Sequence, residues 1–196
     1  RNGWDEPIGR MSDETVAAIL EGLKHLDPIP DVYFGGIGEP LFHPKTIQWI
    51  EAVKKLGVKV ELITNGTTLT PRKSQEIIDA GLDVLWVSID GASEETYSDV
   101  RLGSEYPNIV KNLRRFAKMR KASHYLKPEI GIAFVAMKRN IKDLPKVIQL
   151  GKGIKAKYYS VSNLQPATAA MQDEILYDQT VHNIAYLDAP NLPRLY

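Results

Sequence analysis

The sequence of 196 residues contains no cysteine. A chain without thiols forms no disulfide framework, and it offers no thiolate to zinc or to an iron–sulfur cluster. An excess of charge of one sign is also missing, because 25 lysines and arginines stand against 24 aspartates and glutamates. The formal net charge of +1 gives no electrostatic footprint for nucleic acid or for an anionic membrane.

Long hydrophobic runs are missing as well. No apolar stretch approaches the length that crosses a bilayer, and no signal peptide opens the chain. We therefore expect a cytoplasmic protein with neither nucleic acid nor membrane among its partners. The densest basic stretch, residues 111–121, carries Leu113 and Phe116 among its charges, which is typical of the solvated face of an amphipathic helix.

What the chain does have is an alternation of strand-like and helix-like segments. The strand-like segments are residues 31–34, 58–63, 84–89, 130–137 and 157–163. The third is an almost continuous apolar run, as expected of a strand buried on both faces. Helical periodicity fills the intervals, with start signals at Ser12, Pro44 and Thr70. This alternation predicts an α/β fold, an incomplete (β/α) barrel of about five parallel strands with outer helices.

The alternation ends near residue 165. The last thirty or so residues are rich in Asn, Asp and Pro. We therefore expect a partial barrel at residues 1–165 and a C-terminal extension or linker at residues 166–196, leading toward a further module.

Glycines and polar residues follow the ends of the predicted strands. They are Gly36, Gly38 and Glu39 after the first strand, Thr64 and Asn65 after the second, Ser88 and Asp90 at the third, and Asn163 at the fifth. Each motif alone is typical of a turn or a helix cap. Because the carboxyl ends of parallel strands meet at one edge, their joint occurrence indicates one ligand-binding rim.

The stretch DVYFGGIGEPLFHP, residues 31–44, contains three of these glycines and an acidic residue. Glycine removes a side chain so that another group can approach the backbone, or it lets the chain turn through positive φ. Glu39 adds a negative acceptor at that spot. A tight strand-to-helix turn and a ligand-binding turn both remain open on these residues alone.

Three motifs, in their order and spacing, resemble those of the radical S-adenosylmethionine (radical SAM) superfamily: GGIGEPLFHP, LITNGTTL and VSIDGASEETYSDVR. The resemblance runs from about residue 31 to residue 163. The resemblance implies an iron–sulfur oxidoreductase that uses SAM and a [4Fe–4S] cluster. In that family, SAM is cleaved reductively to a 5′-deoxyadenosyl radical, which abstracts hydrogen from a substrate.

The resemblance also implies roles for the rim residues. Gly36, Gly38 and Glu39 would hold the methionine ammonium of SAM, although Ile37 between the glycines departs from the family pattern. Ser88 and Arg101 would hold its carboxylate through hydrogen-bond donors. The remaining implied contacts are Thr64, Asn65 and Asp90 on the polar rim, Val135 beside adenine and Asn163 at the ribose.

One departure concerns the cluster. Family members bind it through three cysteines in a CxxxCxxC loop after the first barrel strand, and this chain has none. Its opening, RNGWDEPIGRMSDE, resembles the segment that follows the last of those cysteines. We expect the first strand and the cluster loop to precede Arg1 in the full-length protein, and the chain by itself to be inactive.

Two further stretches resemble one branch of the superfamily, RNGWDEPIGRMS at the start and SNLQP at the end of the last predicted strand. This branch has SPASM-type members and proteins that modify the cofactor of tungsten-containing aldehyde oxidoreductases. The implied partners are a small-molecule, peptide or cofactor substrate and an electron donor such as ferredoxin or flavodoxin. His43 fits the start of a helix better than a metal site, because the histidines lack metal-ligand spacing.

Two alternatives stay open. A (β/α)-barrel lyase or isomerase for a phosphorylated substrate needs a late glycine turn, but Gly151 and Gly153 precede a strand instead of a helix. A non-catalytic small-molecule-binding barrel without a cluster is distinguished by the residues upstream of Arg1. A Rossmann dinucleotide site is excluded, because Gly36-Ile-Gly38 lacks the third glycine.

Overall fold

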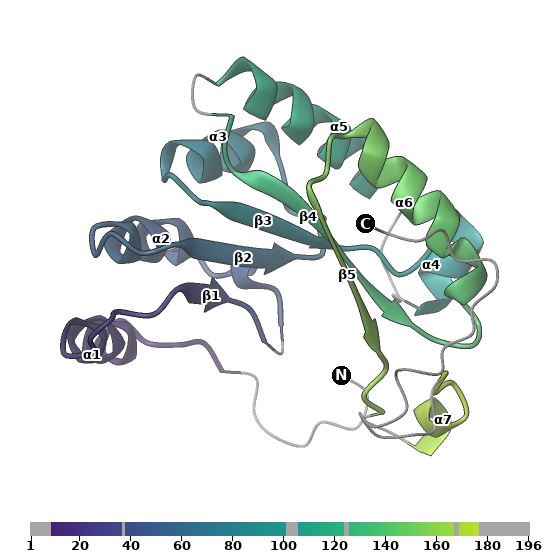
Figure 1. Cartoon of the computed structure of the whole chain (residues 1–196), viewed down its shortest axis with the longest axis horizontal. Helices are drawn as coiled ribbons and strands as arrows, with labels where there is room; N and C mark the ends of the chain where they lie inside the picture. The colour runs from purple at the N-terminus through teal and green to yellow at the C-terminus, as the bar shows by residue number, and fades with distance from the viewer. Residues whose placement is uncertain (1–8, 37, 101–105, 124–125, 167–168, 177–196) are drawn as a thin grey trace.

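The computed structural model describes residues 9–36, 38–100, 106–123, 126–166 and 169–176 (Figure 1). Five strands form one sheet in the order β1-β2-β3-β4-β5, and every neighbouring pair is parallel. They are β1 (Val32–Phe34), β2 (Val60–Thr64), β3 (Val84–Ser88), β4 (Glu129–Ala136) and β5 (Tyr158–Asn163). The predicted α/β fold with five parallel strands in one open sheet is confirmed.

Helices connect consecutive strands and cover one face of the sheet (Figure 1). They are α1 (Asp13–Lys24), α2 (Thr46–Lys54), α3 (Pro71–Asp79), α4 (Glu94–Val100), α5 (Tyr106–Ala122), α6 (Leu144–Gly153) and α7 (Ala169–Gln172), with 3₁₀ turns η1 (Pro40–Phe42) and η2 (Ile141–Asp143). The sequential strand order and the outer helices are those of a barrel that is not closed.

Side-chain caps explain where two of the helices begin. The Oγ of Ser12 accepts the Thr15 N–H before α1, and the Thr70 hydroxyl accepts the Lys73 N–H before α3. Both starts were predicted from the sequence. The start of α2 was predicted two residues too early, at Pro44, because η1 occupies the chain immediately before it.

Two further features differ from the sequence prediction. The helix α4 was not predicted, and α6 continues past Gly151 to Gly153. Gly151 lies inside α6, and a larger residue would not fit at this position, because a Cβ would stand only 2.5 Å from the hydroxyl oxygen of Tyr159 on β5. Its glycine therefore serves close packing between helix and strand, and it does not end the helix.

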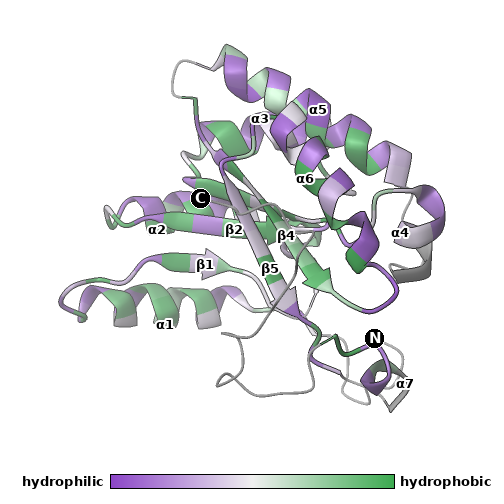
Figure 2. Ribbon diagram, turned by 45° about the vertical axis from the view of Figure 1, so that its right-hand side comes forward, coloured by the Kyte–Doolittle hydropathy of each residue, from purple (hydrophilic) through white to green (hydrophobic). Residues whose placement is uncertain are grey.

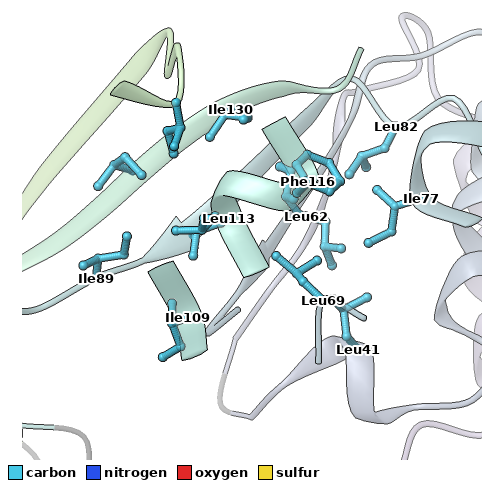
Figure 3. Close-up of a cluster of buried hydrophobic side chains, with 14 of the residues drawn as sticks. Leu41, Leu62, Leu69, Ile77, Leu82, Ile89, Ile109, Leu113, Phe116 and Ile130 are labelled. Carbon is cyan, nitrogen blue, oxygen red and sulfur yellow. The ribbon is translucent and has the colours of Figure 1, made fainter. Parts of the chain in front are cut away.

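The hydrophobic core lies between the sheet and the helices, as the colouring of strands and inner helix faces in Figure 2 illustrates. In Figure 3, Leu113 and Phe116 of α5 point toward the sheet, close to Leu62 of β2. All three side chains are fully buried. Burial of apolar side chains of this size stabilises the fold by about 1.5–3 kcal/mol each, so the core holds the strand ends in place.

The opposite face of the sheet carries a polar and aromatic layer. The indole Nε1 of Trp86 donates to Glu61 at 2.6 Å, and its ring lies 5.9 Å from that of Tyr158. Gly131 on β4 makes room for this ring, since a Cβ there would stand 2.4 Å from it. Because side chains alternate along a strand, Ile63 on β2 and Ser88 on β3, two positions after Glu61 and Trp86, share this face.

Candidate functional site

A pocket of about 360 Å³ lies on this face, where β1, β2 and β3 end. Its lining residues are Gly36, Gly38, Glu39, Phe42, Ile63, Thr64, Asn65 and Ser88. Six of the residues that the sequence singled out are therefore brought together from three separate segments. The volume falls in the usual range for small-molecule sites.

Glu39 has the most defined geometry in the pocket. Its Oε1 accepts the Leu41 N–H at 3.1 Å and the Thr64 hydroxyl at 2.7 Å, while Oε2 accepts the Asn65 N–H at 2.7 Å. The first contact makes Glu39 the cap of η1. The other two join the first strand's loop to the second strand's end, so the carboxylate has a fixed orientation.

These bonds leave acceptor capacity for a ligand. A carboxylate has about four lone-pair positions, and the Glu39 carboxylate uses two on Oε1 and one on Oε2. Among the described lining residues, Glu39 carries the only charge. The pocket therefore presents a pre-oriented negative acceptor that suits a cationic donor such as an ammonium group.

The glycines of this turn serve two different purposes. Gly36 and Gly38 have φ values of +117° and +130°, which other residues rarely adopt. A Cβ at Gly36 would meet no atom within 4 Å, so its glycine is required by conformation and not by space. Gly35 instead yields room to the Tyr33 ring, whose nearest atom would lie 2.2 Å from a Cβ.

Thr64 and Asn65 hold the loop after β2 in shape. The Thr64 oxygen accepts the Gly66 N–H at 3.1 Å while its hydroxyl donates to Glu39. The Asn65 side-chain oxygen accepts the Thr67 N–H at 2.9 Å in a local turn. Ser88 lines the same pocket and is buried.

Asp90, Val135 and Asn163 lie at the ends of β3, β4 and β5, outside the lining of the pocket. Asp90 is buried, and its Oδ1 accepts the Val135 N–H at 2.8 Å. The side-chain amide of Asn140 donates to the carbonyl oxygens of both residues, at 3.0 and 2.9 Å. These contacts tie β3 to β4 at the rim. Arg101 lies outside the described residues.

Phe42 and Ile63 were missed by the sequence reasoning. Phe42 is 63% exposed, which is unusual for a large aromatic side chain, and it lines the pocket from η1. Ile63 lies on the same face of β2 as Glu61, opposite the core face, and the alternation of residues 58–63 already indicated this face. Both add apolar surface beside Glu39.

No metal centre is found in the described part of the chain, where no three His, Asp or Glu side chains are placed to hold an ion. His43 has a structural role as expected, since its Nδ1 accepts the Lys45 N–H and its ring stacks on Trp49 at 4.2 Å. None of the described helices has the length and apolar character to cross a membrane.

Comparison with known proteins agrees with this geometry. The model of the radical SAM superfamily matches residues 2–149. The chain is 30% identical over 179 residues to the tungsten-containing aldehyde ferredoxin oxidoreductase cofactor-modifying protein of Pyrococcus furiosus, covering 91% of this chain and 50% of the relative. It is 34% identical over 161 residues to the AdoMet-dependent heme synthase of Methanosarcina barkeri, covering 82% and 44%. It thus spans about half the length of the curated relatives it matches.

Solved structures share the fold. Streptococcus suis SuiB bound to its precursor peptide SuiA has a TM-score of 0.63 at 13% identity, over 84% of this chain and 35% of that one. The structure of anSMEcpe with bound AdoMet and the Cp18Cys peptide has a TM-score of 0.59 at 21% identity, over 81% and 45%. The family match over most of the sequence leads to one conclusion: this chain belongs to the radical SAM superfamily.

Proposed function

We propose that the pocket binds SAM by its methionine end, as part of a radical SAM enzyme. The observation that carries this proposal is the Glu39 carboxylate, which is fixed by three hydrogen bonds and keeps one acceptor position on Oε2. SAM carries an ammonium group that needs such an acceptor. Gly36 and Gly38, both with positive φ, give the turn before Glu39 its backbone conformation, and both line the pocket with Glu39.

The other end of the methionine moiety is a carboxylate, which needs donors. Ser88 supplies a hydroxyl group within the pocket. Arg101 remains our predicted cationic partner for this carboxylate, since guanidinium forms two-pronged contacts with carboxylates. Phe42 and Ile63 supply apolar surface for the carbon chain beside the sulfonium. The adenosine would extend along the rim toward Asp90, Val135 and Asn163, at the ends of β3, β4 and β5.

The residues of this chain fit SAM, but they do not fit the iron–sulfur cluster, because no cysteine is present to ligate it. We therefore assign no residue of this chain to the cluster. Bound SAM supplies a carbon–sulfur bond that a single electron can break. The contribution of this chain is to bind and orient that molecule from a rigid strand-end rim.

We further propose a reductive SAM cleavage that serves the modification of a cofactor or a peptide. Relatives named for cofactor modification and heme synthesis, and peptide-bound structures of the same fold, support this substrate class. We also propose a ferredoxin or flavodoxin as electron donor and a cytoplasmic location. The division into a partial barrel at 1–165 and an extension at 166–196 is likewise a proposal.

Equilibrium dialysis of radiolabelled SAM against the cluster-loaded, full-length protein tests the site. Glu39→Gln removes the negative charge and should weaken SAM binding about ten- to a hundred-fold, since a hydrogen bond to a charged group contributes roughly 1.5–3 kcal/mol. Glu51→Gln on the exposed face of α2 is the matched control and should leave the affinity unchanged. Equal affinity of Glu39→Gln and the unchanged protein would refute the assignment.

A further inference from the structure

A second cavity lies on the outer surface, between α5 and α6. Its volume is about 990 Å³, larger than that of the strand-end pocket. Helices α5 and α6 lie side by side in Figures 1 and 2 on the helical side of the sheet. The strand-end pocket faces the opposite side, through Ile63 and Ser88. A ligand in this outer groove would therefore not compete with a ligand in the pocket.

The groove is strongly basic. Its charged lining residues are Lys111, Arg114, Arg115, Lys118 and Lys146, and it has no described acidic lining residue. Arg115 is engaged by the fold, since it donates to the Leu69 carbonyl and to Asn112. The other four side chains belong to exposed residues, and no carboxylate of the described residues forms an ion pair with them. Four cations that no described carboxylate neutralises repel one another, and an anionic ligand would relieve that repulsion.

The remaining lining is apolar at its base. Val110 of α5 and Leu150 of α6 are half-buried, and Ile154 beyond α6 is buried. From Pro107 to Lys118 the α5 wall extends about 16 Å, at 1.5 Å per residue. A single phosphate is too small to reach cations spread over that length. The groove instead suits an elongated ligand with acidic groups along its sides and an apolar stripe.

From this combination of charge, apolar base and length, we infer that the α5–α6 groove docks an acidic amphipathic helix of a partner protein. Such a helix places apolar residues at i, i+3, i+4 and i+7 into the groove while its carboxylates meet the basic wall. Single-stranded nucleic acid fits less well, because base stacking needs exposed aromatic faces. Tyr106, the one aromatic residue among the described lining residues, packs against Tyr97 at 5.6 Å. Many partner-facing sites combine steering charges with an apolar centre in this way.

Fluorescence anisotropy on the full-length protein tests the docking groove. The probe is a fluorescein-labelled, N-acetylated 15-residue helix of Glu and Leu, with Leu at i, i+3, i+4 and i+7. We expect saturable binding at 50 mM NaCl that weakens at least ten-fold at 300 mM. A peptide with Lys in place of Glu, and one with Ser in place of Leu, should each bind at least ten-fold more weakly.

Charge reversal assigns the binding to the groove. K111E/R114E/K118E should weaken binding of the Glu/Leu peptide at least ten-fold, whereas R10E/K55E/K138E, three exposed cations elsewhere, should change it less than two-fold. Circular dichroism and thermal unfolding test whether both triple variants are folded. If the groove triple variant does not fold, the single substitution Lys146→Glu on α6 replaces it and should weaken peptide binding about three-fold. SAM affinity should stay unchanged in all of them, which separates this test from that of the strand-end pocket.

Three results would overturn the inference. One is failure of the Glu/Leu peptide to bind, and another is equal weakening by the groove and control reversals. The third is binding of a 15-nucleotide oligothymidylate that is as tight as that of the peptide and equally sensitive to the groove reversal, which would make the groove a nucleic-acid site.

Discussion

The hydroxyl of Thr64 donates to Oε1 of Glu39 at 2.7 Å, although 25 residues separate them in the chain. The same hydroxyl oxygen accepts the Gly66 N–H, so Thr64 links the carboxylate to the loop that follows β2. Two motifs from different strand ends thus share one hydrogen-bonded unit. The orientation of Glu39 depends on a neighbouring strand and not only on its own turn.

Thr64→Val tests this link, because it keeps the shape and removes the hydroxyl. The Gly66 N–H and one Glu39 lone pair lose their partner, so we expect a loss of about 1–2 kcal/mol in the free energy of unfolding. SAM affinity should fall about five- to ten-fold as Glu39 loses its orientation. Urea unfolding and SAM dialysis measure the two effects. Thr15→Val, at an exposed position of α1, should alter SAM affinity less than two-fold.

Gly36→Ala tests whether backbone conformation is what requires glycine in the turn. The residue has φ +117° and open space around its Cβ position, so the substitution should cost about 1–2 kcal/mol through strain alone. Gly22→Ala in α1 also meets open space, but at a helical φ it should raise stability by about 0.5–1 kcal/mol. Chemical denaturation compares the two alanines directly. A Gly36→Ala protein as stable as the unchanged one would contradict the strain argument.

Gly131→Ala should clash with the Trp86 ring, whose three nearest atoms would lie 2.4–2.7 Å from the new Cβ. The ring cannot move freely, because its nitrogen is hydrogen-bonded to Glu61. We expect a loss of about 1–3 kcal/mol in stability from overpacking. Trp86→Leu lowers stability by itself. Adding Gly131→Ala to Trp86→Leu should lower the free energy of unfolding by less than about 0.5 kcal/mol further, because the ring is then absent. A double-mutant cycle by urea unfolding decides this, and strict additivity would exclude the clash.

The environment of the Asp83 carboxyl leads us to predict that the folding stability of the protein depends on pH. Burial acts to raise the pKa of its carboxyl, but hydrogen bonds from Lys127, Lys54 and the Val60 N–H outweigh it and hold the pKa below its ordinary value. A carboxyl with a lowered folded-state pKa stabilises the protein above its unfolded-state pKa of about 3.9 and loses that contribution as pH falls through the folded-state pKa. We therefore expect a loss of stability below about pH 4.

Asp83→Asn is the matched variant for this pH effect. The amide cannot attract Lys54 and Lys127, whose ammonium groups lie 2.6 Å from the carboxylate oxygens, so we expect a loss of about 2 kcal/mol at pH 7. Between pH 5 and pH 2.5 its stability should fall less steeply than that of the unchanged protein. Urea titrations across this range measure both slopes, and parallel slopes would show that Asp83 does not contribute.

The parallel sheet and the joint location of the rim motifs were predictable from the sequence. The reason is local: apolar strand runs, caps such as Ser12 and Thr70, and alternating element types leave few ways to arrange a parallel sheet. Six of the residues that line the pocket could be named from the sequence, because polar groups that follow parallel strands share one edge of the sheet. Even the family followed from the order of three motifs.

Tertiary structure decided what each of these residues does. Besides the Leu41 N–H of its own turn, Glu39 is held by Thr64 and Asn65 at the end of β2. Asp90 ties β3 to β4 through its contacts with Val135 and Asn140. Gly131 and Gly151 serve the rings of Trp86 and Tyr159, which no local pattern reveals. The basic run of α5 becomes a groove only beside α6. Contacts between distant segments depend on how whole elements pack, and local sequence carries no direct record of them.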